Sequence, residues 1–174
     1  MPEMERFTDA IALLKADHRN VEALFAEFAA ARGADKKQRL ARSICVELKV
    51  HMAIEEEIFY PAFRGQIEDT ILNEAYVEHD AAKVLINDIN SARATEDFFD
   101  AKVTVLCEEV RHHVHEEEAP SEGMFSQCRA TDVDLVDLRD ALMICPLLSG
   151  PKLMIFWITK ETRNAEQEAS PGRD

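Results

Sequence analysis

Residues 96–118 read EDFFDAKVTVLCEEVRHHVHEEE, and the spacing of apolar side chains in this stretch predicts a helix. Apolar residues recur three or four positions apart, at Phe99, Val103, Leu106 and Val110. The same helix face continues with His113 and, one turn later, with Glu117. His112 and His115 fall on other faces, so we expect both to be exposed. The stretch is therefore an amphipathic helix whose apolar face ends in two potential ligands.

Three earlier segments show the same helical period, over about residues 7–31, 37–63 and 68–93. Glycine and proline punctuate the chain at or near the ends of the predicted helices, at Gly33, Pro61, Gly65, Pro120 and Gly123. Connections of only a few residues make consecutive helices antiparallel. The sequence therefore predicts an all-α protein, an up-down-up-down four-helix bundle, and no strand pattern competes with this.

Histidine or glutamate interrupts the apolar face of each predicted helix. The residues concerned are His18, His51, Glu55, His79, His113 and Glu117. At about 1.5 Å of rise per residue, the histidines of the first three helices reach the same depth, and His113 with Glu117 comes within about one turn of it. Residues four apart stack on one helix face, so the fourth helix repeats the His51–Glu55 pair as His113–Glu117. We therefore expect one polar layer across the core.

This layer predicts a metal site. A single histidine on an apolar face is usually a hydrogen-bonded core residue, but six polar side chains at one level need a common explanation. Burying two carboxylates without compensation costs several kcal/mol each, and a cation is the simplest compensation. Imidazole with carboxylate favours iron, manganese or zinc over calcium, and a carboxylate can bridge two cations. The neighbouring Glu56, Glu57, Glu116 and Glu118 are interpreted as a solvated face. Tyr60 and Tyr76 are interpreted as packing residues, with a redox or hydrogen-bonding role as the alternative.

Charge and composition exclude several classes of partner. The formal net charge is -14, which disfavours nucleic acid and anionic membrane surfaces. The N-terminal MPEMERFTDA lacks the apolar segment of a signal peptide, and the apolar residues 142–158 are broken by SGPK, so no membrane span is expected. The four cysteines form no C-x-x-C pair and are predicted to be reduced thiols. A cytoplasmic location is the expectation.

The stretches KADHRNVEALF, HMAIEEEIFYPAF, EHDAAKVLI and VRHHVHEEE together resemble the hemerythrin-like HHE cation-binding family, over roughly residues 7–125. The resemblance implies a four-helix bundle that holds a non-haem di-iron centre, with manganese or zinc as less favoured occupants. Carried over position by position, it implies the same six ligands, and both Glu55 and Glu117 are expected to bridge the two irons.

Two departures from the oxygen-carrying members of that family bear on function. Those proteins have a further histidine one turn before the ligand of the third helix, where this chain has Ala75, and an aspartate where it has Glu118. The missing imidazole implies an open or water-filled coordination position, which argues against simple reversible oxygen carriage. After its last motif this chain also continues with APSEGMFSQCR, where the family commonly steps into Phe-Pro.

The sequence divides the chain into a bundle over residues 1–125 and a C-terminal part over residues 126–174, which is expected to contain a helix and a partly disordered tail. TDVDLVDLRDALMI predicts a fifth, shorter helix, and the apolar LMIFWI segment in the tail could mediate self-association. Three functions stay open: a protein that binds O2, NO or peroxide, or holds iron, in a redox or stress response; a di-iron oxidoreductase that reduces peroxide or NO; and a structural zinc site in a bundle used for protein contacts. The first is favoured, and the sequence does not decide whether the protein is an enzyme.

Overall fold

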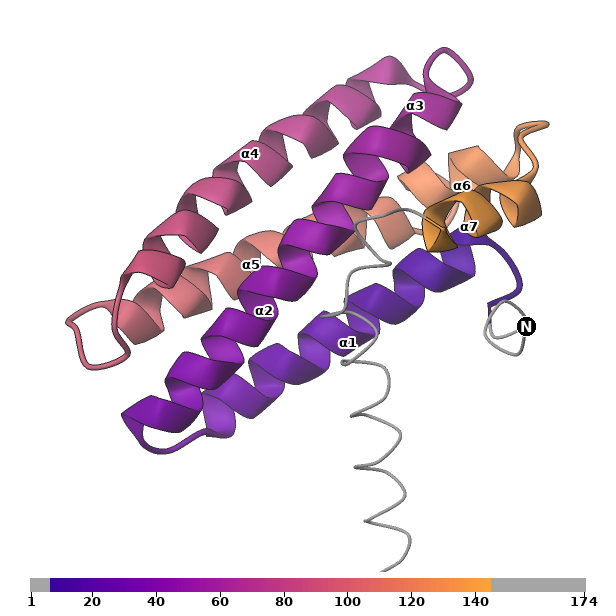
Figure 1. The fold of residues 1–174 in the computed structure, drawn as a ribbon. Helices are drawn as coiled ribbons and strands as arrows, with labels where there is room; N and C mark the ends of the chain where they lie inside the picture. Colours follow the sequence, from indigo (N-terminus) through magenta and orange to yellow (C-terminus); the bar gives the residue numbers. More distant parts are fainter. Residues whose placement is uncertain (1–6, 145–174) are drawn as a thin grey trace, which may run out of the picture.

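Four long antiparallel helices form the body of the molecule (Figure 1). A computed structural model describes residues 7–144. The long helices are α1 (Ala10–Ala30), α2 (Ala34–Ile54), α4 (Asp69–Ser91) and α5 (Phe99–Glu118). α2 packs against α1 and α4, and α5 closes the ring against α4 and α1. The predicted all-α, up-down-up-down four-helix bundle is confirmed.

The ends of α1 are set by local chemistry. The Asp9 carboxylate accepts a hydrogen bond from the Ala12 amide at 2.8 Å, which satisfies one of the free donors of the first turn. At the other end Gly33 adopts φ 86°, a left-handed conformation that side-chain-bearing residues rarely tolerate. This turn lets α2 start only a few residues after α1 and run back beside it.

The second helix differs from its prediction as one continuous helix over 37–63. After α2 the chain forms a π-helical turn, Glu55–Phe59, followed by the short α3, Tyr60–Phe63. Pro61 explains the change, since it has no N–H to donate to the carbonyl groups of preceding residues and its ring crowds the previous turn. The Tyr76 hydroxyl, from α4, donates to the Glu56 carbonyl at 3.1 Å. The wider turn is thus held by a side chain from the neighbouring helix.

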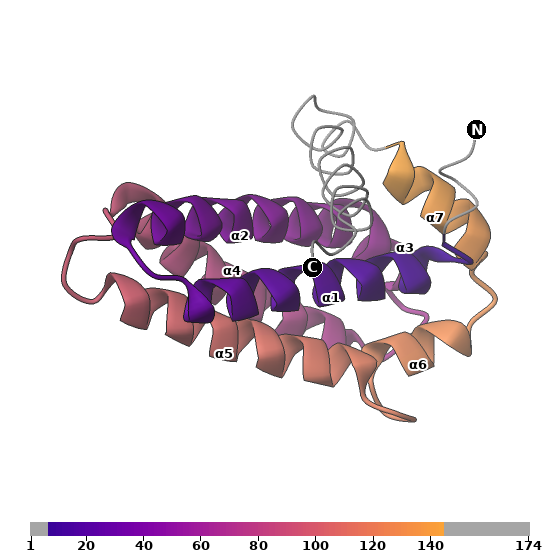
Figure 2. The ribbon, with the colours of Figure 1, turned by 90° about the horizontal axis from the view of Figure 1, so that it is seen from below.

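Two short helices cover one end of the bundle, α6 (Met124–Arg129) and α7 (Leu135–Met143), as Figure 2 shows. α7 falls within the predicted fifth helix, and the residue before it, Asp134, caps its start by accepting hydrogen bonds from the amides of Val136 and Asp137. α6 was not predicted. Arg129 ties it to the start of α1 through two hydrogen bonds to the Asp9 carboxylate, at 3.0 and 3.1 Å.

The sequence-based division at residue 125 falls inside α6. Cys128 of α6 and Leu142 of α7 are buried in the same apolar cluster as the start of α1. The LMIFWI segment and the rest of the tail lie outside the described residues. Among the helices of the described part, none is long and apolar enough to cross a membrane.

The buried apolar side chains of the described residues form two clusters. One gathers around Leu14, Phe59 and Phe125, at the end capped by α6 and α7. The other gathers around Phe28, Ile44 and Phe99, towards the opposite end. The buried polar and charged side chains come from the helix segments between these two clusters. The polar layer expected from the sequence thus separates two apolar cores.

Candidate metal centre

Six polar side chains from four helices meet between the two apolar cores. α1 supplies His18, α2 supplies His51, the π turn begins with Glu55, α4 supplies His79, and α5 supplies His113 and Glu117. All six are buried; Glu55 is 0% exposed and Glu117 1%. These are the residues that the sequence singled out as ligands, and the fold brings all six together.

The histidine rings direct their Nε2 atoms towards one another. The Nε2 atoms of His18 and His51 are 3.0 Å apart, and those of His79 and His113 are 3.2 Å apart. The glutamates lie between these pairs: Glu55 Oε2 is 3.3 Å from His51 Nε2 and 3.4 Å from His79 Nε2. Glu117 Oε2 is 3.3 Å from His18 Nε2, and its Oε1 is 3.6 Å from His113 Nε2. Each carboxylate therefore contacts a histidine of both pairs.

The donor atoms fall into two groups that could each hold one cation. His18, His51, Glu55 and Glu117 place one donor atom each within 4.8 Å of one another, and Glu55, His79 and His113 do the same. Glu55 belongs to both groups. This arrangement is what a carboxylate-bridged pair of metal ions needs, because one shared carboxylate can bind two ions through its two oxygens.

The outward-facing nitrogens of the histidines also meet carboxylates. His18 Nδ1 lies 2.8 Å from Glu118, His79 Nδ1 lies 2.9 Å from Glu56, and His113 Nδ1 lies 2.7 Å from Glu78. A carboxylate only accepts, so Nδ1 carries a proton, and an imidazole that gives up its other proton would present its Nε2 lone pair to the centre of the layer.

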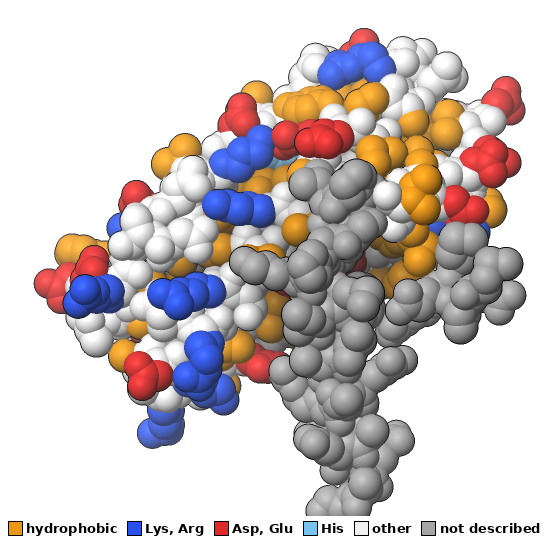
Figure 3. Space-filling model, viewed as in Figure 1, with side chains coloured by type: hydrophobic (Ala, Val, Ile, Leu, Met, Phe, Trp, Pro, Cys, Tyr) orange, Lys and Arg blue, Asp and Glu red, His pale blue; other side chains and the backbone are white. Residues whose placement is uncertain are grey.

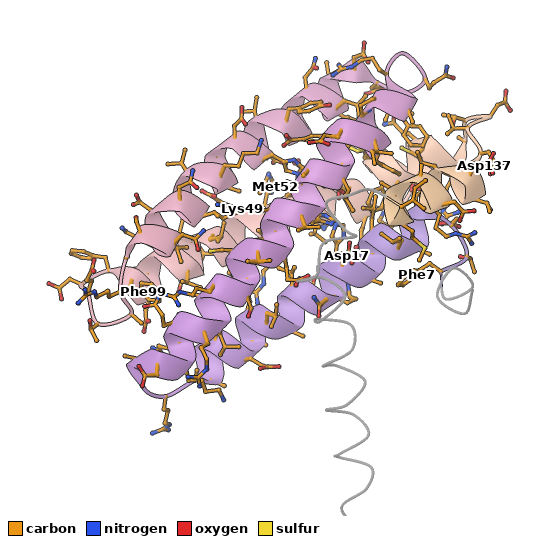
Figure 4. The ribbon with its side chains drawn as sticks, viewed as in Figure 1. Phe7, Asp17, Lys49, Met52, Phe99 and Asp137 are labelled. Carbon is orange, nitrogen blue, oxygen red and sulfur yellow. The ribbon has the colours of Figure 1, made fainter. Side chains whose placement is uncertain are left out.

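His51 follows the same pattern at longer range, with its Nδ1 3.6 Å from Asp17 Oδ2; Asp17 is labelled in Figure 4. The interpretation of Glu56 and Glu118 as members of a solvated face was therefore incomplete, since each also orients a histidine. Asp17 and Glu78 each directly precede a histidine of the layer in sequence, but each serves a histidine of another helix. Sequence spacing within one helix does not reveal such pairs.

Tyr60 adds a phenol oxygen to the layer. Its hydroxyl lies 3.0 Å from Glu117 Oε1, 3.3 Å from Glu55 Oε2 and 3.4 Å from His79 Nε2. In the π turn the Tyr60 amide bonds to the carbonyl of Glu55, five residues earlier, so Tyr60 stacks over Glu55. Burial and then the two carboxylates raise the pKa of Tyr60 well above its usual value. Tyr60 packs on aromatic neighbours as predicted, but it also reaches both central carboxylates.

In the metal-free protein, protonated histidines offset the negative charge of the buried carboxylates. Burial alone lowers the pKa of His18, but the carboxylates of Glu117 and Glu118 outweigh burial and raise it to about 10. Burial opposes the charge of His113 in the same way, and nearby glutamates, Glu117 first, raise its pKa to about 9. Burial raises the pKa of Glu55, but His51 and His79 lower it more, to about 2. Imidazolium protons thus compensate the buried carboxylates when no cation does.

We expect the metal-free protein to lose stability as the pH rises above 6.5. The folded-state pKa values of His18 and His113, about 10 and 9, lie above the ordinary value of 6.5, so the folded chain binds more protons than the unfolded chain in this window. Their contribution is complete below pH 6.5 and disappears as the pH passes through the two folded-state values. Thermal melting of chelator-treated protein from pH 6.5 to 10 measures this, and a melting temperature that rises over that range would contradict it.

The donor set fits a pair of cations. Glu55 Oε1 and Glu117 Oε2 are buried and have no hydrogen-bond partner among the described residues. Buried carboxylate oxygens without a partner carry a large desolvation penalty, which a coordinated cation removes. Four imidazole nitrogens and two carboxylates form a donor set suited to iron, manganese or zinc.

The other histidines of RHHVHEEE lie outside the layer. His112 and His115 are both exposed. The His112 side chain is 63% exposed and contacts Glu116 and Glu78 at the surface, at 3.2 and 3.5 Å. The helical register thus places His113 on the buried face and His112 and His115 on the exposed faces.

Known proteins resemble this chain in both sequence and fold. The family described as the hemerythrin HHE cation binding domain matches residues 9–120. A protein from Nostoc sp. named DNA nickase is 29% identical over 107 residues, which is 62% of this chain and 30% of that protein. The crystal structure of a hemerythrin HHE cation binding domain-containing protein from Mycobacterium kansasii has a TM-score of 0.64 at 18% identity, covering 78% of this chain and 83% of the other.

Proposed function

Because this chain belongs to the hemerythrin HHE cation-binding domain family, we propose that its polar layer holds two iron ions that interact with O2, NO or peroxide. The observation that carries the proposal is the convergence of four inward-facing Nε2 atoms on two buried carboxylates that each keep an oxygen without a hydrogen bond. Bound iron would supply one-electron redox changes and an exchangeable coordination position.

The side chains of this chain then have distinct tasks. Four histidines would hold the metal ions through Nε2, and the Glu55 and Glu117 carboxylates would neutralise their charge, with Glu55 within reach of both groups of donor atoms. Glu118, Glu56 and Glu78 hold three of the histidine rings by accepting from Nδ1, with Asp17 near the fourth. The Tyr60 hydroxyl donates its one proton to Glu117 Oε1 at 3.0 Å and so orients this carboxylate, with Glu55 Oε2 3.3 Å away.

The position of Ala75 favours reaction over carriage. Ala75 lies one turn before His79 and is buried in the apolar cluster, so no imidazole reaches the layer from this position. Oxygen carriers that this chain resembles have a histidine there. Fewer neutral nitrogen donors stabilise the reduced state less, which favours oxidation over reversible binding. This difference supports the proposal of a role in redox chemistry or in the response to oxidative or nitrosative stress.

Nucleic acid is not proposed as a partner. The net charge is -14, and on the face shown in Figure 3 acidic and basic side chains are interspersed over the described helices. A nucleic-acid-binding protein needs a basic patch to neutralise phosphates. The chain spans 30% of the Nostoc protein named DNA nickase, and the activity in that name is not carried over here.

Metal analysis of anaerobically purified protein tests the proposed function. Cells supplied with both iron and zinc should yield a protein with about two iron ions per chain, because the layer offers two groups of N/O donors that share a carboxylate. Absorption spectra before and after exposure to peroxide and NO should then change at the iron bands. A protein with one zinc and no iron would remove the di-iron proposal and support a structural metal site.

We also expect the reduced protein to be oxidised by air within seconds to minutes, without a long-lived reversible O2 complex. The reason is the absence of a histidine at position 75. Stopped-flow absorption after mixing the reduced protein with oxygenated buffer measures the rate. A spectrum that returns to its starting state when oxygen is removed would restore a carrier function.

A further inference from the structure

A small cavity opens beside the metal layer, on the side of the second apolar core. Its volume is about 30 Å³, enough for a water or a diatomic molecule. All four histidines of the layer line it. The rest of its wall is mostly apolar, with Val21 from α1, Met52 from α2, Ala82 from α4 and Val110 from α5; Met52 is labelled in Figure 4. A ligand in this cavity lies against the metal-facing histidines and little else that is polar.

Apart from the histidines, the polar residues of this wall are Glu78 and Glu109. Glu109 lies on α5 one turn before His113, and its Oε2 atom is buried without a hydrogen-bond partner among the described residues. The other titratable groups that face the cavity are His18 of α1, His51 of α2, Glu78 and His79 of α4, and His113 of α5. The four histidines are candidate ligands, and Glu78 accepts from His113 Nδ1. Among the described residues that line the cavity, Glu109 is the one titratable residue that is neither a candidate ligand nor a hydrogen-bond partner of one.

The surroundings of Glu109 make its carboxyl group easier to protonate than an exposed glutamate. Burial raises the pKa of this group above its ordinary value. A neutral carboxylic acid can donate a hydrogen bond and a proton, whereas a carboxylate can only accept. The residue is only half-buried, so protons lost to the cavity can be replaced from solvent.

The geometry points to Glu109 as the hydrogen-bond and proton donor to a small ligand with acceptor atoms, such as peroxide or azide, bound in this cavity. This inference rests on the proposed function, because the ligand is held on its other side by the metal. It assigns to Glu109 a task that none of the six candidate metal ligands can perform, since their donor atoms face the metal.

Azide binding to the full-length, iron-loaded ferric protein tests this assignment. In the wild type, azide affinity should fall by about tenfold for each pH unit above the pKa of Glu109, because one proton accompanies each azide. Glu109→Gln should remove this component, leaving only the pH dependence of the metal site itself. Infrared spectra of bound azide should shift in D2O for the wild type, and Glu109→Leu should abolish most of the shift. Glu108→Gln, at the exposed neighbouring position, is the matched control and should behave as the wild type.

The outcomes separate this inference from the proposed function. A wild type that loads no iron overturns both. A wild type that loads iron, but whose azide affinity is independent of pH and whose azide vibration is unchanged in D2O, overturns the role of Glu109 without any variant. Equal pH dependence in the wild type and Glu109→Gln, at equal iron content, does so as well.

Discussion

His113→Ala should strip the chain of most of its metal, whereas His112→Ala and His115→Ala should leave the metal content nearly unchanged. The His113 Nε2 atom lies 3.2 Å from His79 Nε2 inside the layer, whereas His112 and His115 are exposed. Loss of a candidate ligand also leaves Glu117 with one imidazole fewer. The expected loss of affinity exceeds the roughly 10- to 100-fold that changes to outer-shell partners of metal ligands cause.

The three variants form a matched set, because each removes one imidazole from the same eight residues. Metal per chain is measured by mass spectrometry after identical purification, with circular dichroism to show that each variant keeps its helices. Equal losses in all three variants would show that the surface histidines also hold metal and would contradict the assignment of His113 alone.

Glu55→Gln should lower the metal content from about two ions per chain to fewer than one, and Glu57→Gln should not change it. Glu55 is the carboxylate shared by both groups of donor atoms, so its neutralisation affects both positions at once. An amide keeps the shape of the side chain but loses the negative charge that compensates two cations. Glu57, two residues away, is exposed and supplies the same change of charge at the surface.

The number of metal ions bound per chain distinguishes the two variants most clearly. Metal titration of the apoproteins, followed calorimetrically, should show two sites in Glu57→Gln and at most one weak site in Glu55→Gln. Glu55→Gln that still binds two ions with wild-type affinity would mean that Glu55 does not bridge, and the shared-carboxylate arrangement would then be wrong.

The sequence predicted the four long helices and the six side chains of the layer for one physical reason. The helices and the layer residues both follow from the helical repeat, because the repeat that places Leu14 in the core also places His18 on the same face, one turn later. Helix depth follows from rise per residue, so the meeting of His18 with His51 needed only the short connection at Gly33. Local periodicity carried these predictions.

What the sequence did not reveal depends on a break in that period or on contacts between helices. The π turn shifts Tyr60 over Glu55, where a regular α-helix would place Phe59, so the register that worked elsewhere missed a group of the site. The cause, Pro61, was visible, but its effect also depends on Tyr76 of another helix, whose hydroxyl donates a hydrogen bond to the Glu56 carbonyl. α6 is short, and its place is set by the contact of Arg129 with Asp9, at the far end of the chain.

The division of the interior into two apolar cores has a consequence for how the chain opens. Each core contains side chains from several helices, and the six buried polar and charged side chains of residues 7–144 lie between the two cores. Segments with their own packed core can unfold as separate cooperative units. Without a cation to bridge the layer, the two halves should exchange their amide hydrogens at different rates, and ion binding should merge them into one unit. The metal would then couple the unfolding of the two halves of the bundle, in addition to any chemistry that it performs.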